Sequence, residues 1–497
     1  MSLCFLRVIQ LSPPTKRSDT STAGNYISGV KMNSLKTTDR LAYAIGGGFA
    51  SNLGFYVMLI FFITFATDIY GVDPVTVGVI TLVSRLIDTI TDPLMGAIGD
   101  STKTRFGKYR FWIMWSAPFA GACTWMVFAS PDVSVLAKII YMYTAYILYS
   151  IVSTAANIPY HSLTAYITDD VKERSNIVLI KQFSGLLTQF FVSAGGVFIL
   201  EICSKHYDVN GNVIIDTSGY NMLGLVFGVM MTLGFWLCAW GARNNDTLTR
   251  IQREERNTES LSVLTVFRQM LLAFKSRSLI SLSIMSSAST LVLAMSSGIT
   301  VQFYTYVFQD AGLVKTSALI NVFFGALAYL LVKFMVMRYG NKKSFTWMCI
   351  LTIIPAIILY FTFQKESALY VMVMLGLIMC FTQAASLLTW VMVTDCADEL
   401  RWRTRKNAAG IASSTLTFSN KFGSAIGAVS LGYVLRFIDY TPGSAVQNTA
   451  AIEGLVWLMV IIPIVGKLIA LLSMFFYPLN TKYHQQILAE IKDMEVK

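Results

Sequence analysis

Residues Val77 to Ile98 read VGVITLVSRLIDTITDPLMGAI, and this apolar run predicts a membrane-spanning helix with three charges in its middle. Arg85, Asp88 and Asp92 are spaced i, i+3, i+7, so they project from one face of that helix. A charge costs about 3 kcal/mol or more at such a depth, so this face is expected to meet other helices or a watery cavity. Paired carboxylates in a cavity suit a cation or a proton. The alternative is a structural Arg–Asp bridge that only locks helix packing.

The composition extends this interpretation to the whole chain. Of 497 residues, 55% are hydrophobic and only 13% are charged, whereas soluble domains carry about 25% charged residues. A spanning helix needs about 20 apolar residues. We therefore predict an all-α membrane protein with twelve transmembrane helices, the eleventh diluted by Ser and Thr. The expected spans are 41–66, 73–98, 110–130, 135–160, 178–202, 219–242, 279–308, 313–337, 344–363, 368–394, 408–435 and 452–477.

A polar stretch after the sixth span divides the chain into two six-helix halves. Two such bundles around a central pathway are typical of the major facilitator fold, in which a midplane site alternates its exposure. The amphipathic segment Ser260–Phe274 is expected to lie along the cytoplasmic surface. The predicted domains are a disordered extension (1–38), an N-terminal bundle (39–242), a central loop (243–277), a C-terminal bundle (278–480) and a cytoplasmic tail (481–497).

The net charge of +11 is unevenly placed between the predicted loops. One side holds basic clusters, such as Lys103 to Arg110 and Arg401 to Lys406, while the other side holds only scattered lysines and one arginine. By the positive-inside rule, this asymmetry puts both termini in the cytoplasm. The positive charge therefore indicates orientation in a lipid bilayer and not a nucleic-acid surface. The seven cysteines show no paired spacing that predicts disulfides or a zinc site.

The fourth predicted helix carries a second polar stripe. Thr154, Asn157 and His161 repeat the i, i+3, i+7 spacing, so they share one face. A hydroxyl and an amide on such a face can ligate a cation or bond a sugar hydroxyl. Polar residues also hold membrane helices together without any ligand, and the spacing alone leaves both interpretations open.

Several motifs occur in a specific order along the chain. They are RLIDTITDPLMG (85–96), RFGKYRFW (105–112), NIPYHSLT (157–164), WVMVTD (390–395), KFGSAIG (421–427) and FYPLN (476–480). This ordered set resembles the glycoside–pentoside–hexuronide:cation symporter family. The resemblance runs from about Asp39 to the C-terminus.

That family carries a sugar or glycoside inward with Na⁺, H⁺ or Li⁺, and the resemblance implies a cation site here. Asp88 and Asp92 match its cation-site carboxylates, and Thr154 matches a cation-associated threonine. Arg85 and Lys421 match two basic residues of the same region. If the coupling ion is Na⁺, the two aspartates are its predicted ligands. No other cofactor is expected.

The resemblance also implies a sugar site with two changes of chemistry. Two sugar-binding aspartates of the family are asparagines here, Asn52 and Asn157. An asparagine does not repel anions as an aspartate does, which leaves room for an acidic sugar such as a hexuronide. The family's arginine on the fifth helix falls on Lys181 or Gln182. The predicted sugar-site residues are Asn52, Asn157, His161, Lys181, Gln182 and Trp390.

The predicted function is secondary active transport: import of a sugar or glycoside by symport with H⁺ or Na⁺, through alternating access. A sugar uniporter and a membrane sugar sensor without transport are the alternatives. An enzyme is not expected, because no Ser-His-Asp set, metal-ligand cluster or phosphate loop occurs in the sequence. The resemblance implies a multi-pass protein of the bacterial inner membrane, and we expect a monomer.

Overall fold

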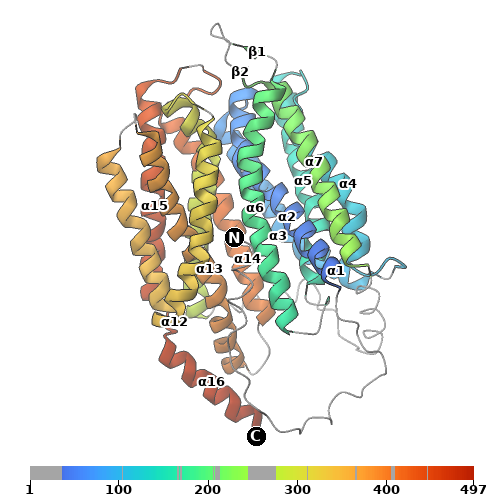
Figure 1. Ribbon diagram of the computed structural model, residues 1–497, viewed down its shortest axis with the longest axis vertical. Coiled ribbons are helices and arrows are strands. Elements are labelled where there is room, and N and C mark those ends of the chain that lie inside the picture. Colours follow the sequence, from blue (N-terminus) through green and yellow to red (C-terminus); the bar gives the residue numbers. More distant parts are fainter. Residues whose placement is uncertain are drawn as a thin grey trace. The chain divides into compact units, whose positions relative to one another are not determined.

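The computed structural model describes residues 36–102, 104–164, 167, 171–204, 206–207, 213–243, 276–310, 312–363, 367–404, 409–444 and 446–496. Almost all of them are helical, and the helices run side by side (Figure 1). Most of the predicted extension 1–38 and the whole amphipathic segment Ser260–Phe274 lie outside the described residues.

The helices of the first half correspond closely to the first six predicted spans. One continuous helical segment contains α1 and α2, with π-helical stretches η1 and η2 after each of them. Two-residue strands pair antiparallel between α6 and α7. The bounds are α1 Thr37–Leu41, η1 Ala42–Gly46, α2 Gly47–Thr64, η2 Phe65–Ile69, α3 Pro74–Ser101, α4 Arg110–Phe128, α5 Val135–Leu163, α6 Val171–Cys203, β1 His206–Tyr207, β2 Val213–Ile214 and α7 Thr217–Gly241.

The second half has the same helical character. Its bounds are α10 Arg277–Gly298, α11 Thr300–Gln302, η3 Phe303–Val307, α12 Leu313–Thr362, α13 Ala368–Thr404, α14 Ala409–Phe437, α15 Thr449–Phe475 and α16 Thr481–Val496. The first three of these form the seventh predicted span. A helix breaks there at Ile299, whose φ of −103° and ψ of 1° depart from helical values.

Ten described helices are long and apolar enough to cross a membrane. One of them, α12, has 50 residues and would be about 75 Å long if straight, far more than the roughly 30 Å of a hydrocarbon core. Gly340 interrupts it with a φ of 75° and a ψ of 170°, so α12 contains the predicted spans 313–337 and 344–363. The Ser- and Thr-rich α14 is not among the ten. The predicted count of twelve is reached if α12 contributes two crossings and α14 one.

Side-chain caps fix where several helices begin. Asp73 accepts a hydrogen bond from the Thr76 amide, and Pro74 follows it as the first residue of α3. Asp216 caps α7, Ser276 caps α10 and Asn448 caps α15 in the same way. A capping side chain satisfies backbone N–H groups that have no partner inside the helix, and proline fits the first helical position.

Each half packs mainly within itself. In the first half, α4 contacts α5 and α7 while α2 contacts α6 and α7; in the second, α12 contacts α13 and α15 while α10 contacts α14 and α15. The main contacts between the halves join α3 to α14, α6 to α12 and α2 to α10. The functional residues therefore have to be sought on these facing helices.

The predicted tail contains a helix, α16, which the sequence analysis did not anticipate. It lies at the opposite end of the bundle from β1 and β2 (Figure 1). Its side chains bond to α13: the indole of Trp402 donates to Glu490 over 2.7 Å, and Nε2 of His484 lies 3.0 Å from Oδ2 of Asp398. The buried Ile487 and Ile491 lie four residues apart, as in an amphipathic helix.

Candidate functional site

The charged face of α3 meets α5 of its own half and α14 of the other half. Asp88 is buried and Asp92 is partly buried on this face. Intramembrane carboxylates are tolerated where other groups compensate them, so the partners of each aspartate define what the site can do.

Asp88 finds its partners within the first half. Nη1 of Arg85 donates to Asp88 Oδ2 over 3.2 Å, one helical turn away. The hydroxyl of Ser150 on α5 donates to the other carboxylate oxygen. Ser150 was missed by the sequence analysis, although it lies four residues before Thr154 and so on the same helix face.

Asp92 connects three helices from both halves. Thr154 of α5 donates to Asp92 Oδ1 over 3.2 Å, while the ammonium of Lys421 on α14 donates to Asp92 Oδ2 in an ion pair. This is the point at which a predicted cation-site carboxylate contacts the opposite half. Any ion or proton that binds Asp92 has to compete with Lys421.

The four charges of this region balance one another. Arg85 compensates Asp88, and Lys421 compensates Asp92, so the arrangement is neutral without a bound cation. Within the part of the chain that the structure describes, no group of three or more His, Cys, Asp or Glu side chains is placed to hold a metal ion. The oxygen atoms described at this site are those of the Asp88 and Asp92 carboxylates and of the hydroxyls of Ser150 and Thr154, which bond Asp88 and Asp92 respectively.

The asparagines predicted for the sugar site lie on different helices. Asn157 on α5 donates to the carbonyl and hydroxyl oxygens of Ser153, each over 3.0 Å, and its own carbonyl oxygen is buried with no partner among the described residues. Asn52 on α2 donates to the Gly48 carbonyl over 2.7 Å and packs beside Gly185 of α6. The Asn157 carbonyl oxygen therefore has hydrogen-bonding capacity that no described residue uses.

Lys181 on α6 has polar and aromatic neighbours. Its ammonium donates to the Thr164 hydroxyl over 2.8 Å and lies 3.9 Å from the ring centroid of Tyr160. No carboxylate among the described residues forms an ion pair with it. Lys421, in contrast, forms an ion pair with Asp92. The ring of His161 lies beside that of Tyr160, with the two ring centroids 4.9 Å apart.

The other predicted sugar-site residues show fewer polar contacts. Gln182 is exposed on α6, next to Lys181, and His161 on α5 is exposed as well. Trp390 on α13 is 45% exposed. None of these three side chains has a described hydrogen bond to the residues above.

A separate set of contacts joins the halves near the ends of η2, η3 and α14, which we call the predicted outer end because the charge pattern assigns it to the outside. Asp68 of η2 accepts a hydrogen bond from the Tyr440 hydroxyl over 2.7 Å and one from Gln302 over 3.4 Å. Lys315 of α12 forms an ion pair with Glu201 of α6. None of these five residues was predicted to join the halves.

Backbone packing closes the same end. A Cβ on Gly78 of α3 would lie 2.9 Å from the Cα of Val429 on α14. A Cβ on Gly298 of α10 would lie 3.1 Å from the side chain of Ile63 on α2. Only residues without a side chain allow the helices to approach so closely. The structure is therefore closed between the halves at the predicted outer end.

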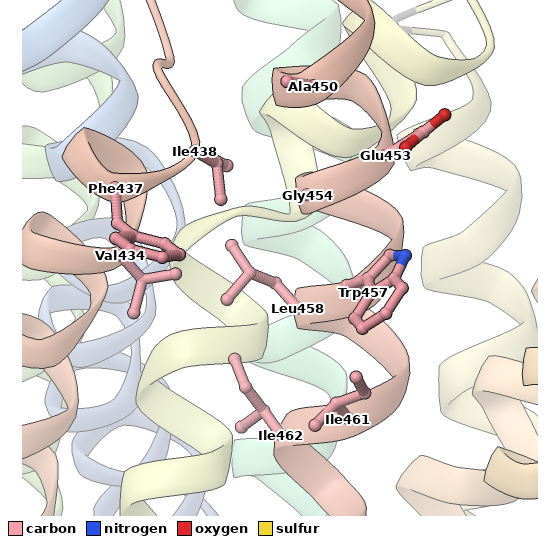
Figure 2. Close-up of a pocket in the computed structure, with 10 residues that line it drawn as sticks. All are labelled: Val434, Phe437, Ile438, Ala450, Glu453, Gly454, Trp457, Leu458, Ile461 and Ile462. Atoms are coloured by element: carbon pink, nitrogen blue, oxygen red, sulfur yellow. The ribbon is translucent and has the colours of Figure 1, made fainter.

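An apolar groove lies between the end of α14 and the first half of α15 (Figure 2). None of the predicted site residues lines it, and Glu453 projects outward at its rim. Its lining residues are Val434, Phe437, Ile438, Ala450, Glu453, Gly454, Trp457, Leu458, Ile461 and Ile462.

Comparison with known proteins gives a consistent result. A family model described as MFS/sugar transport protein matches residues 43–481. The chain is 28% identical over 480 residues to the uncharacterized symporter YnaJ of Bacillus subtilis (strain 168), covering 93% of this chain and 96% of that protein. It is 26% identical over 479 residues to the isoprimeverose transporter of Lactiplantibacillus pentosus, covering 96% and 95%.

The solved structures support the fold. The crystal structure of the nucleoside transporter NupG matches with a TM-score of 0.59 at 14% identity, covering 90% of this chain and all of that one, 100%. At that identity the likeness concerns the fold alone. It confirms the predicted all-α architecture of the major facilitator type.

Proposed function

Because the chain belongs to the MFS/sugar transport protein family, we propose that it imports a sugar or a glycoside by symport with a cation. The resemblance to glycoside–pentoside–hexuronide:cation symporters is confirmed by the family match and the symporter relatives. The chain is a membrane transporter and not an enzyme. We further propose that it works as a monomer in the bacterial inner membrane, with both termini in the cytoplasm.

The observation that carries the proposal is the position of Asp92. It bonds Thr154 within its own half and Lys421 in the other half. An ion that neutralises Asp92 removes an attraction between the halves, so its binding alters the relative energies of the carrier's conformations. A ligand shifts such an equilibrium only through differential affinity for the two states. This coupling favours a symporter over a uniporter.

We propose H⁺ rather than Na⁺ as the coupling ion. A hard cation such as Na⁺ prefers several clustered oxygen ligands, whereas here each aspartate already has a basic partner. A proton needs only one carboxylate oxygen. Protonation of Asp92 would release Lys421, whose freed ammonium then lies within reach of a ligand in the central pathway.

The substrate class proposed here includes an acidic sugar. Lys181 has no carboxylate partner among the described residues, and its ammonium lies over the ring of Tyr160 and donates to the Thr164 hydroxyl. A charge in such surroundings is best compensated by an opposite charge, which a substrate carboxylate or sulfonate would supply. A neutral glycoside held by hydrogen bonds to Asn157 is the alternative.

The test is uptake of labelled sugars, neutral and acidic, into vesicles that contain the protein, with Na⁺ and pH gradients imposed separately. Proton symport predicts uphill sugar uptake when a proton gradient is directed into the vesicles. It also predicts that a Na⁺ gradient at constant pH does not change uptake. Stimulation by Na⁺ alone would overturn the choice of ion. Sugar counterflow without any gradient separates a transporter from a sensor, because a sensor gives none.

A further inference from the structure

Lys467 is a basic residue in the membrane core that the coupling site does not use. It lies on α15, eight residues before the helix ends at Phe475, which is about 12 Å along the axis. Its side chain is 0% exposed. A lysine at this distance cannot extend its ammonium to the helix end, so Lys467 stays among apolar helices. Intramembrane lysines are costly and most often functional.

The surroundings of Lys467 offer one hydrogen bond. Its Nζ donates to the Ser289 hydroxyl on α10 over 3.2 Å. The adjacent Gly466 brings α15 against α10 so closely that a Cβ there would lie 3.3 Å from the Ala288 carbonyl oxygen. An ammonium needs partners for three N–H groups, and the described surroundings satisfy one.

Among the residues that the structure describes, no carboxylate lies on the helices that mainly contact α15 around Lys467. The main contacts of α15 are with α10, α12 and η3, and none of these elements contains an Asp or Glu. The only acidic residue of α15, Glu453, is 14 positions away. The titratable group that acts on Lys467 is the buried thiol of Cys349 on α12. A charged ammonium would thus be unpaired, which is strongly destabilising in a buried site.

The helix that bonds Lys467 also contacts the coupling region and the closed end. Ser286 of α10 donates to Asn420, the neighbour of Lys421. After the break at Ile299, Gln302 donates to Asp68 at the predicted outer end. A movement of α10 that opens this end would therefore change the packing around Lys467 as well.

From this arrangement we propose that Lys467 is a second proton-binding site of the carrier. It is a neutral amine in the conformation closed at the predicted outer end, and it takes up a proton when α10 moves away from α15. Protonation then opposes closure, because the closed packing has no partner for the charge. The proposal does not depend on which sugar is carried or on the role of Asp92.

The test compares two variants that fix the charge. Lys467→Met mimics the neutral amine, whereas Lys467→Arg carries a charge at every accessible pH. Closure is measured by the reaction of an introduced cysteine, Ile63→Cys, with a membrane-impermeant thiol reagent, in a Cys203→Ser background. Ile63 lies against Gly298 of the other half, so it is protected when the end is closed.

The expected results differ in direction. In the parent protein, the reaction rate corrected for the thiolate fraction at each pH should rise as the pH falls, by up to about tenfold per pH unit for one proton. Lys467→Met should lose this part of the pH dependence and stay protected, while Lys467→Arg should be reactive at every pH. The same variants of the exposed Lys333 on α12 are the matched controls and should behave as the parent.

Three outcomes would overturn the proposal. One is a pH dependence in Lys467→Met equal to that of the parent, and another is a Lys467→Arg protein that stays protected. The third is loss of the pH dependence in Cys349→Ala, which would assign the proton to the thiol. If Lys467→Arg does not fold, the comparison of Lys467→Met with the parent protein is sufficient to test the proposal. Repeating it in an Asp92→Asn background removes any contribution from the coupling site.

Discussion

Lys421 and Asp92 form an ion pair between α14 and α3, although 329 positions separate them in the sequence. The pair joins the two halves at the helix face that the sequence analysis singled out. Thr154 bonds the second oxygen of the same carboxylate. Neutralising Asp92 therefore affects both the candidate cation site and the contact between the halves.

Asp92→Asn should abolish uphill accumulation while sparing exchange. An asparagine keeps the size of the side chain but neither binds a proton nor attracts Lys421 as a charge, so the ratio of internal to external sugar should fall to about 1. Counterflow of sugar, measured in the same vesicles, should persist. A variant that still concentrates sugar against its gradient would contradict the coupling role of Asp92.

Asp88→Asn should differ from Asp92→Asn in its effect on stability. Asp88 is 5% exposed and compensates Arg85, whose Nε already has no described partner. Removing one member of a buried pair leaves an uncompensated charge and costs about 3–5 kcal/mol. Thermal unfolding in detergent should show a clearly lower midpoint for Asp88→Asn than for Asp92→Asn. Equal midpoints would argue that Arg85 finds another partner.

Ser150→Ala tests the partner that sequence reasoning missed. The change removes one hydrogen bond to the Asp88 carboxylate, and bonds to charged groups contribute about 1.5–3 kcal/mol each. We expect a loss of stability in this range and a coupling defect milder than that of Asp92→Asn. Ser153→Ala, on the same helix, is the control because its hydroxyl bonds Asn157 instead.

The sequence predicted the helices well because bilayer spans need long apolar runs, and these are visible without a structure. It also predicted the face that carries Asp88 and Asp92, since helical spacing fixes which side chains point together. The α14 span was the hardest to predict from composition, because Ser and Thr dilute it. The structure explains their presence in part: Ser419 and Ser424 bond backbone carbonyls of their own helix.

The sequence alone could not predict which side chains on distant helices contact each other. Nothing local indicates that Asp68 would meet Tyr440, 372 positions away, because the contact depends on how the halves pack. Two other features did have a local signal. Lys467 is a single charge within an apolar run, and α16 has its buried isoleucines at helical spacing.

Tyr440→Phe tests whether the Tyr440–Asp68 hydrogen bond keeps the predicted outer end closed. The phenol donates to Asp68 across the halves, and its loss removes a bond to a charged acceptor, worth about 1.5–3 kcal/mol. The equilibrium between the closed and the open conformation should shift by about tenfold or more toward the conformation that is open at the predicted outer end. Protection of Ile63→Cys from an impermeant reagent is the readout. Unchanged protection would mean that Glu201, Lys315 and the glycine contacts suffice for closure.

Variants of Lys181 distinguish an acidic substrate from a neutral one. If its ammonium binds a substrate carboxylate or sulfonate, Lys181→Met should reduce uptake of an acidic sugar at least tenfold, since a charge-assisted pair is lost and the anion has no replacement partner. Lys181→Arg keeps the charge and should retain part of this activity. Thr164→Val removes the hydroxyl that accepts from Lys181 and should weaken binding less than the loss of charge.

Competition measurements complete this test in the parent protein. Glucuronides or sulfonated sugars in excess should block uptake of the labelled substrate, and the block should disappear in Lys181→Met. If neutral glycosides block uptake while the acidic sugars do not, the ammonium serves another purpose. Its contacts with Tyr160 and Thr164 would then hold α6 against α5, and Asn157, with its unpartnered carbonyl oxygen, would be the first residue to test for binding of a neutral sugar hydroxyl.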